Sequence, residues 1–176
     1  GGLGPALRSL INYQKLGLNH TWLESVEPIP EDTLPLVHQY EGDVDTYDLH
    51  ASSDLYGGGG LVSTVGDMTR FMRGLFEGNI FSEPSTLNTM LAPVPAQRGG
   101  PDYGIWQQVP GIYRLGIIAE YNDRVYSHKG HFGTMAAYVP DLEMAISLSL
   151  NYSRQGKDSD YRDIFLAEIL KLFGIE

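Results

Sequence analysis

The spacing of apolar residues changes along this chain, from helical spacing in the first half to an alternation of two in the second. Helical spacing covers residues 5–15 and 65–76, and Thr64 with Asp67 forms a variant of the capping box before the second segment. A shorter helix is expected at 84–90. The residues expected to bound these helices are Gly17, Gly78 and, as an N-terminal cap, Ser82. The first half therefore predicts three helices.

Alternation with a period of two begins at Tyr103 and predicts a β-sheet. The expected strands cover residues 103–109, 113–121, 123–129, 135–140 and 143–151. Tight connections are expected at Asn122-Asp123 and Asp141-Leu142. Because apolar residues alternate with small ones in the last strand, we expect other elements to pack against both of its faces.

A final helix is expected after Asp160, which is placed to cap it, and Gly174 is expected to end it. Its expected apolar stripe consists of Tyr161, Ile164, Phe165, Ile169 and Leu172. An acidic, aperiodic segment covers residues 24–55. This order of elements predicts an α+β fold, an antiparallel β-sheet flanked by helices that cover one of its faces. The length of 176 residues predicts a single domain, residues 1–176.

Charge and composition exclude several classes of function. The net charge is −10, and no Lys or Arg lies between Lys15 and Arg70, so we expect no nucleic-acid or membrane partner. The Asp43-Val44-Asp45 sequence lacks the glycine and the closing glutamate of a calcium loop, which favours a solvated loop over a cation site. The chain has no cysteine, which excludes a disulfide, a thiol nucleophile and a cysteine zinc site. No cofactor is expected.

The most informative segment, residues 126–134, reads Tyr-Ser-His-Lys-Gly-His-Phe-Gly-Thr, a predicted strand that runs into a turn. Its pattern from His128 onward is H-x-G-x-x-G-T. This pattern resembles the third motif of the penicillin-recognising serine hydrolases: serine β-lactamases, especially class C, D-Ala-D-Ala carboxypeptidases and related esterases. In that family the strand forms one wall of the active site. Further segments that resemble the family's motifs, in the family's order, are 16–21, 58–71, 103–104 and 150–151.

The resemblance implies roles for three residues of this strand and turn. His128 takes the position of the family's lysine or histidine, near the nucleophile, where it can hydrogen-bond a substrate carboxylate. Gly130 leaves room for a substrate that lies antiparallel to the strand. The backbone N–H of His131 corresponds to one of the two donors that stabilise the tetrahedral oxyanion. Lys129 is expected to point away from His128, toward solvent or the rim of the site.

The sequence contains no Ser-x-x-Lys, the family's nucleophile motif, and its Ser149-Leu150-Asn151 matches the second motif only as letters on a predicted strand. We therefore expect the C-terminal portion of such a hydrolase, inactive alone, whose partner is the missing N-terminal half of the same protein and whose substrate is a small molecule or peptide. The exposed edge of 143–151 is expected to promote self-association. The resemblance also implies a periplasmic or extracytoplasmic parent. A non-catalytic module that binds a ligand or peptide along the His128 strand is the alternative.

A metal site is a second hypothesis for the same segment. His128 and His131 lie three residues apart, and histidine pairs are common metal ligands. At a strand-to-turn junction, however, the two side chains are expected to face different directions, which disfavours a shared metal ion.

Overall fold

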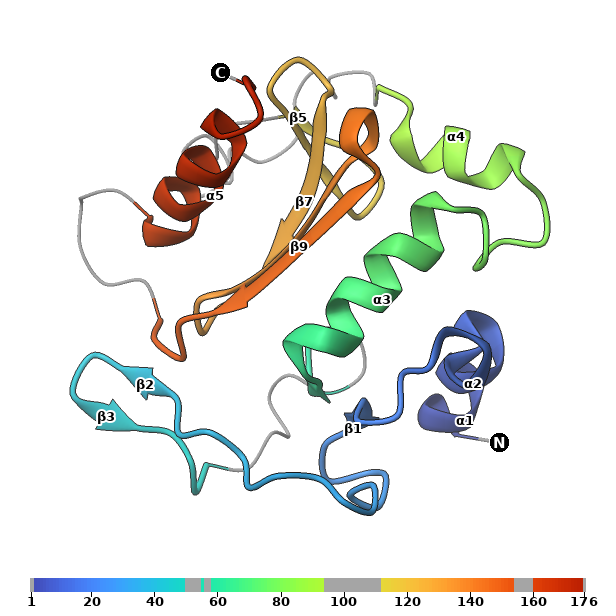
Figure 1. Ribbon diagram of the computed structural model, residues 1–176. Helices are drawn as coiled ribbons and strands as arrows, with labels where there is room; N and C mark the ends of the chain where they lie inside the picture. The colour runs from blue at the N-terminus through green and yellow to red at the C-terminus, as the bar shows by residue number, and fades with distance from the viewer. Residues whose placement is uncertain (1, 50–54, 56–57, 94–111, 154–159, 176) are drawn as a thin grey trace, which may run out of the picture.

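The computed structural model describes residues 2–49, 55, 58–93, 112–153 and 160–175. Its centre is a five-stranded antiparallel sheet with helices packed against it (Figure 1). The strand expected at 103–109, with its Tyr103-Gly104 motif and Trp106, lies outside the described residues. The described elements are helices and an antiparallel sheet, which confirms the predicted α+β fold.

The strands of the sheet follow sequence order, and each is antiparallel to the next. Their bounds are β5 (Ile112–Tyr113), β6 (Ile118–Glu120), β7 (Val125–Lys129), β8 (Thr134–Val139) and β9 (Met144–Ser149). The strand expected at 113–121 is instead two strands, because the N–H of Arg114 donates to the carbonyl of Ile117 over 2.7 Å and closes a turn. The tight connections expected at Asn122-Asp123 and Asp141-Leu142 are confirmed.

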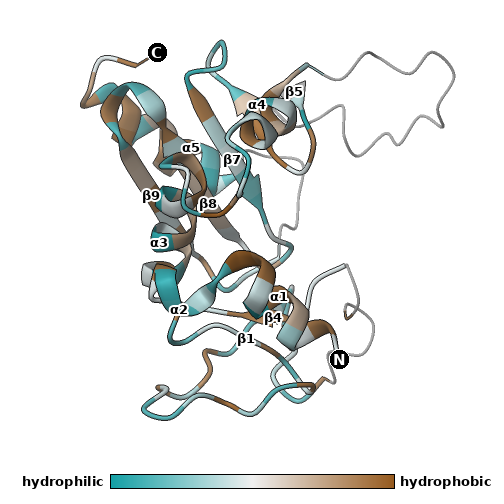
Figure 2. Ribbon diagram, turned by 90° about the vertical axis from the view of Figure 1, so that its right-hand side faces the viewer, coloured by the Kyte–Doolittle hydropathy of each residue, from teal (hydrophilic) through white to brown (hydrophobic). Residues whose placement is uncertain are grey.

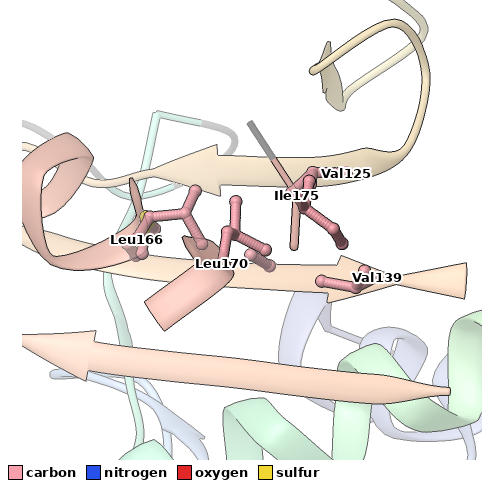
Figure 3. Packing of buried hydrophobic residues seen from close by; sticks show 7 residues of the cluster. Val125, Val139, Leu166, Leu170 and Ile175 are labelled. Atoms are coloured by element: carbon pink, nitrogen blue, oxygen red, sulfur yellow. The ribbon is translucent and has the colours of Figure 1, made fainter. Parts of the chain in front are cut away.

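Helices cover both faces of the sheet, so the expectation of a single covered face is wrong. α5 (Tyr161–Lys171) packs on one face and α3 (Val65–Phe76) on the other (Figure 1). The buried core on the α5 side consists of Val125, Met135, Ala137, Val139, Leu166, Leu170 and Ile175 (Figure 3). Each large aliphatic side chain buried there contributes about 1.5–3 kcal/mol to folding.

The apolar stripe that was expected to bury α5 against the sheet is mostly exposed, so this prediction is wrong. Its exposed members are Tyr161, Ile164, Phe165 and Leu172. Leu166 and Leu170 are buried instead, together with Arg162 one turn earlier. Both sets recur at helical spacing, so periodicity alone does not decide which set faces the sheet.

Aromatic rings fill the opposite interface, between α3 and the sheet. Phe76 stacks on Tyr138 with ring centroids 4.4 Å apart and 8° between the planes, and its centroid lies 5.4 Å from that of Tyr126. α3 also packs against β9, where Ala145 contributes to this interface while Met144 packs on the α5 side. The prediction that both faces of the last strand are covered is therefore confirmed.

Two boundaries of the expected helices differ from the structure. The helical elements concerned are α1 (Leu3–Ile11), α2 (Tyr13–Leu16) and α4 (Ser85–Leu91). The helix expected at 5–15 is split at Asn12, which has a left-handed φ of 55° and caps α2 through its side chain. Gly17 ends α2 as expected, with φ 68°. The cap expected at Ser82 is wrong, because the N-cap position of α4 is occupied by Pro84.

Two pairs of short strands lie in and around the acidic segment. The pairs are β1 (Trp22–Leu23) with β4 (Leu61–Val62), and β2 (Tyr40–Glu41) with β3 (Val44–Asp45). α1, α2, β1 and β4 lie together at one end of the molecule, below the sheet as drawn in Figures 1 and 2. Tyr40 accepts from the N–H of Ser153 over 2.8 Å and donates its own N–H to Asn151 over 3.0 Å. The β2–β3 hairpin is thereby joined to the chain just beyond β9.

The fully buried carboxylate of Asp67 connects α3 to the loop before β1. It accepts from the N–H of His20 over 2.9 Å and from the hydroxyl of Thr21 over 2.7 Å, and it pairs with Arg70. The N–H of Asp67 donates to the Thr64 hydroxyl over 3.0 Å, which confirms the predicted cap. These bonds bring together two segments, 16–21 and 58–71, that the sequence singled out.

Replacing Asp67 with Ala is expected to lower the free energy of unfolding by about 3 kcal/mol, since the half-buried N–H of His20 and the buried hydroxyl of Thr21 lose their acceptor. Urea denaturation of the chain measures the change. Arg73→Ala is the control: it removes an exposed ion pair with Glu77 on the same helix and should cost about 0.5 kcal/mol or less. Equal losses in the two variants would contradict the role assigned to Asp67.

Candidate functional site

The turn from Gly130 to Thr134, the first residue of β8, brings backbone groups of the two strands close together. The N–H of Gly130 donates to the carbonyl of Thr134 over 2.9 Å. Gly133 has φ 76°, and a Cβ added there would lie 2.8 Å from the carbonyl oxygen of Tyr152 and 2.9 Å from Cβ of Leu150. Only glycine fits this position without displacing the neighbouring backbone. The sequence singled out Gly133 as part of the motif but did not identify this contact.

The segment 150–151, which resembled the end of the family's last strand, lies directly against this turn. The N–H of Leu150 donates to the carbonyl of Gly133 and that of Tyr152 to the carbonyl of Phe132, each over 3.1 Å. Two of the sequence motifs therefore meet at one place in the structure.

His128 lies on β7, with an exposed side chain, on the face opposite Lys129. Its Nε2 is 3.2 Å from the hydroxyl of Tyr113, and the two rings meet edge to face at 6.0 Å. Neighbouring groups displace enough water to lower the pKa of His128, against a smaller raising effect from a backbone hydrogen bond at Lys129. The imidazole is therefore neutral at pH 7. Tyr113 was not singled out from the sequence, because it was expected at the start of one strand, 113–121, which the structure divides into β5 and β6.

The side chain and the backbone N–H of His131 have separate surroundings. Its side chain is exposed, and its Nε2 lies 2.7 Å from a carboxylate oxygen of Glu41 on the β2–β3 hairpin. The backbone hydrogen bonds of the turn involve the neighbours of His131. The N–H of His131 itself donates to no acceptor among the described residues. An N–H left open in a fixed turn is what an anion-binding position requires.

Gly130 is constrained by its own turn. A Cβ added at Gly130 would lie 2.2 Å from the hydroxyl oxygen of Thr134. The carbonyl of Gly130 accepts from Nη1 of Arg162 over 2.5 Å. These contacts give an internal reason for glycine here, in addition to the substrate approach inferred from the sequence.

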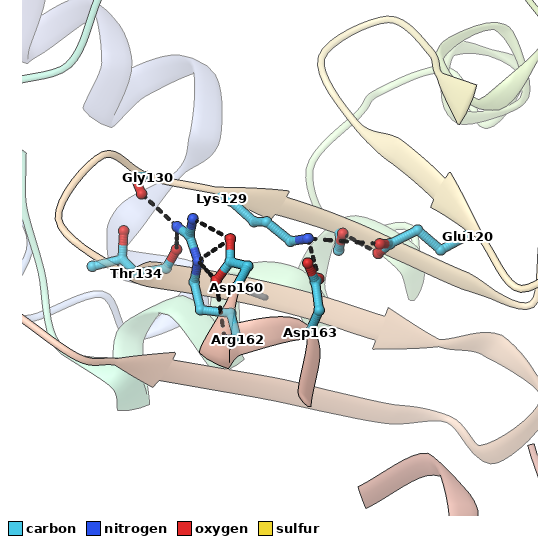
Figure 4. Close-up of polar contacts among 8 residues, drawn as sticks. Glu120, Lys129, Gly130, Thr134, Asp160, Arg162 and Asp163 are labelled. Carbon is cyan, nitrogen blue, oxygen red and sulfur yellow. Dashed lines mark hydrogen bonds and ion pairs between the residues drawn. The ribbon is translucent and has the colours of Figure 1, made fainter. Parts of the chain in front are cut away.

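Lys129 corrects an expectation. Its side chain points away from His128, as strand alternation requires, but it does not lie at the solvent or the rim: only 10% of it is exposed. Its ammonium pairs with Asp163 of α5 and lies 3.8 Å from a carboxylate oxygen of Glu120 (Figure 4). Lys129 therefore forms a largely covered ion pair, because α5 packs on the face of the sheet that was expected to remain open.

Glu120 shares this buried cluster. It accepts a hydrogen bond from the hydroxyl of Ser127 over 2.5 Å. Burial raises the pKa of Glu120, and the opposing effects of Ser127 and Lys129 only partly offset that rise. Ser127 is itself fully buried, so it is not available as a nucleophile.

Arg162, at the start of α5, was missed by the sequence. Its guanidinium donates to the carboxylate of Asp160 and to the carbonyls of Gly130 and Thr134 (Figure 4). Asp160 also accepts from the N–H of Arg162 over 3.0 Å, which confirms the predicted cap. One feature of the sequence could have identified Arg162: it lies at helical spacing from Leu166 and Leu170, and therefore on the same buried face of the helix.

The metal hypothesis finds no support in the described part of the chain. His128 contacts Tyr113, whereas His131 contacts Glu41. No group of three or more His, Asp or Glu side chains is placed to hold a metal ion among the described residues.

A profile of the beta-lactamase family matches residues 13–171. The match covers most of the chain, and the chain therefore belongs to the beta-lactamase family. No curated protein matches the sequence. In the described residues, no helix is both long enough and apolar enough to cross a bilayer.

Solved structures share the fold. D-amino acid amidase from Ochrobactrum anthropi SV3 superposes with a TM-score of 0.72 at 21% identity, covering 96% of this chain and 51% of the amidase chain. EstCE1, a hydrolase with promiscuous acyltransferase activity, superposes with a TM-score of 0.53 at 19% identity, covering 90% of this chain and 48% of its own. At such identities the likeness shows the fold alone. The chain spans about half the length of these structures.

Replacing Glu120 with Gln is expected to flatten the pH dependence of stability. Because the pKa of Glu120 is raised in the folded state, its contribution is present below the unfolded pKa and is lost as pH rises through the folded value. The wild type should therefore lose stability relative to Glu120→Gln as the pH rises above the ordinary pKa of a glutamate, about 4.3. Denaturation midpoints below and above this pH measure the difference.

Glu168→Gln is the matched control, because Glu168 is an exposed carboxylate on α5. Its midpoints should run parallel to those of the wild type. Parallel midpoints for Glu120→Gln as well would show that Glu120 is not the group whose pKa is raised.

Proposed function

We propose that this chain supplies the His-x-Gly wall of the active site in a beta-lactamase-family serine hydrolase that transfers acyl groups from amides or esters. The observation that carries the proposal is the 130–134 turn, which follows His128 on β7 and in which the N–H of His131 donates to no acceptor among the described residues. The reaction begins when a serine hydroxyl attacks the substrate carbonyl and the resulting oxyanion is stabilised by backbone N–H donors. The N–H of His131 is one such donor.

The register of the sheet supports a docking line for substrate along β7. β6 pairs with residues 125–127 of β7, and β8 pairs with the other edge. Within the described residues, the β6-side edge of His128 to Gly130 is therefore unpaired. A substrate with an extended backbone can pair there as an added strand, which is how many peptide-binding sheets work.

His128 is the first residue of this unpaired edge, and its Nε2 contacts the hydroxyl of Tyr113. A neutral imidazole can accept one hydrogen bond and donate another. It can therefore hydrogen-bond a substrate carboxyl or hydroxyl and, at the same time, a group near the nucleophile. β-Lactams, D-Ala-D-Ala peptides and small esters share the acyl chemistry that this wall serves. The amidase and acyltransferase names of the structural relatives support the same reaction class.

The serine and its activating lysine are proposed to lie in an upstream half of the same protein. β9 is the last strand of the described sheet, so one of its edges is free to accept a strand from that half. Exposed apolar side chains on α5 and directly after it add surface for packing; they are Ile164, Phe165, Leu172 and Phe173. A periplasmic location is proposed with the family assignment. Without the upstream half, the same edge is proposed to pair two copies of the chain.

The alternative is a non-catalytic module that binds a peptide along β7. The free edge of His128 to Gly130 serves that function equally well, because strand addition needs no nucleophile. Covalent labelling by a substrate analogue separates the two functions.

In the full-length protein, His128→Ala is expected to lower the rate of serine acylation on the order of a hundredfold, because a positioned proton-transferring or hydrogen-bonding group is lost. Stopped-flow acylation by a chromogenic cephalosporin measures the rate. His20→Ala is the matched control: His20 lies before β1 and joins the fold through its backbone N–H. An unchanged acylation rate in folded His128→Ala would remove His128 from the site.

The 176-residue chain alone is expected to remain unlabelled by a fluorescent penicillin, since no serine in it has a lysine at Ser-x-x-Lys spacing. Gel fluorescence with mass spectrometry reads the result. Stoichiometric labelling of any serine in this chain would contradict the division of the site between two halves.

A further inference from the structure

A buried arginine fastens α5 to the turn of the proposed site. Nη1 of Arg162 lies 2.5 Å from the carbonyl oxygen of Gly130 and 3.0 Å from that of Thr134, the two ends of the turn (Figure 4). Its Nε and Nη2 donate to the carboxylate of Asp160 over 2.9 and 2.7 Å. One planar group thus connects the helix start with both ends of the turn.

The charge of this arginine is balanced inside the fold. Arg162 is 7% exposed, and a buried guanidinium is stable only when its charge and its N–H groups are matched. Burial tends to raise the pKa of Asp160, but the hydrogen bonds and charge of Arg162 outweigh it and hold that pKa below its ordinary value. The pair is therefore ionised at neutral pH. A lysine ammonium lacks the planar fork that serves a carboxylate and two carbonyls together.

The bonds from Arg162 bracket the open N–H of His131. Gly130 and Thr134 lie on either side of it in sequence, and their carbonyl oxygens are drawn to a single donor atom. With its two ends held, the peptide plane of His131 has little freedom to rotate. The ion pair between Lys129 and Asp163 of α5 reaches the strand before the turn. This ion pair does not involve the carbonyls of the turn.

We propose that Arg162 is a positioning residue for acyl transfer, which sets the direction of the His131 N–H toward the oxyanion by holding the carbonyls of Gly130 and Thr134. This inference rests on the proposed function. Arg162 acts through the backbone, so its loss should reduce transition-state stabilisation while leaving substrate binding nearly intact. Displacing a catalytic group by about 1 Å can cost on the order of a hundredfold in rate.

The test compares Arg162→Ala, Arg162→Lys and Arg124→Ala in the full-length protein. Arg124→Ala is the matched control, because it removes an arginine in an exposed ion pair with Asp141. For Arg162→Ala we expect kcat to fall about tenfold or more with KM within about twofold. Arg162→Lys should recover part of the rate, and Arg124→Ala should match the wild type.

A second readout is independent of activity. Amide exchange at Gly130, whose N–H donates to the carbonyl of Thr134 and so closes the turn, should accelerate in folded Arg162→Ala and remain unchanged in Arg124→Ala, as measured by NMR. Lys129→Met removes the ion pair between β7 and Asp163 of α5, and it should leave exchange at Gly130 close to that of the wild type. If Arg162→Ala fails to fold, Arg162→Lys with the same two readouts carries the test.

The outcomes separate the two proposals. If the wild type acylates and Arg162→Ala acylates equally fast, the positioning role is overturned and the proposed function stands. If Lys129→Met lowers kcat and accelerates exchange as much as Arg162→Ala, anchoring of α5 explains both and the specific role is overturned. If the wild-type protein is never acylated, the proposed function fails, and amide exchange alone decides whether Arg162 holds the turn.

Discussion

The structure depends on the burial of both faces of β8. Met135, Ala137 and Val139 face α5, whereas Ala136 and Tyr138 face α3, so one six-residue strand holds the two helical layers together. Alternation along a strand makes this possible without any change in backbone direction. β7 and β9 pair with β8 along its length, and their positions are therefore set by the same layers. Because the turn joins β7 to β8, this packing also sets the positions of its two ends.

Polar residues add a second level of order at the end of the sheet nearest the turn. Apolar side chains such as Leu170 and Val139 fill the α5 interface in its middle (Figure 3), whereas the start of α5 presents Arg162 and Asp163 to the strand ends (Figure 4). Apolar packing alone allows a helix to slide, because it is not directional. Directed bonds to particular carbonyls and to Lys129 fix the register of the helix on the sheet.

The sequence predicted local features well and their partners poorly. The caps at Thr64 and Asp160 are confirmed because a cap depends on residues a few positions apart. The side of α5 that is buried was predicted wrongly, since both of its faces carry apolar residues and the deciding contact, from Arg162 to Gly130, spans 32 positions. The motif around His128 was recognised, but its contact with Tyr113 depends on a strand register that spacing does not specify.

The contacts of the turn also constrain the order in which the protein can fold. Gly133 bonds to Leu150, and the chain beyond Leu150 bonds to Tyr40, while His131 meets Glu41 across 90 positions. Contacts between segments so distant in sequence form only after the intervening chain has lost much of its conformational freedom. We therefore expect the helices to form early from local interactions and the turn to acquire its final shape late in folding.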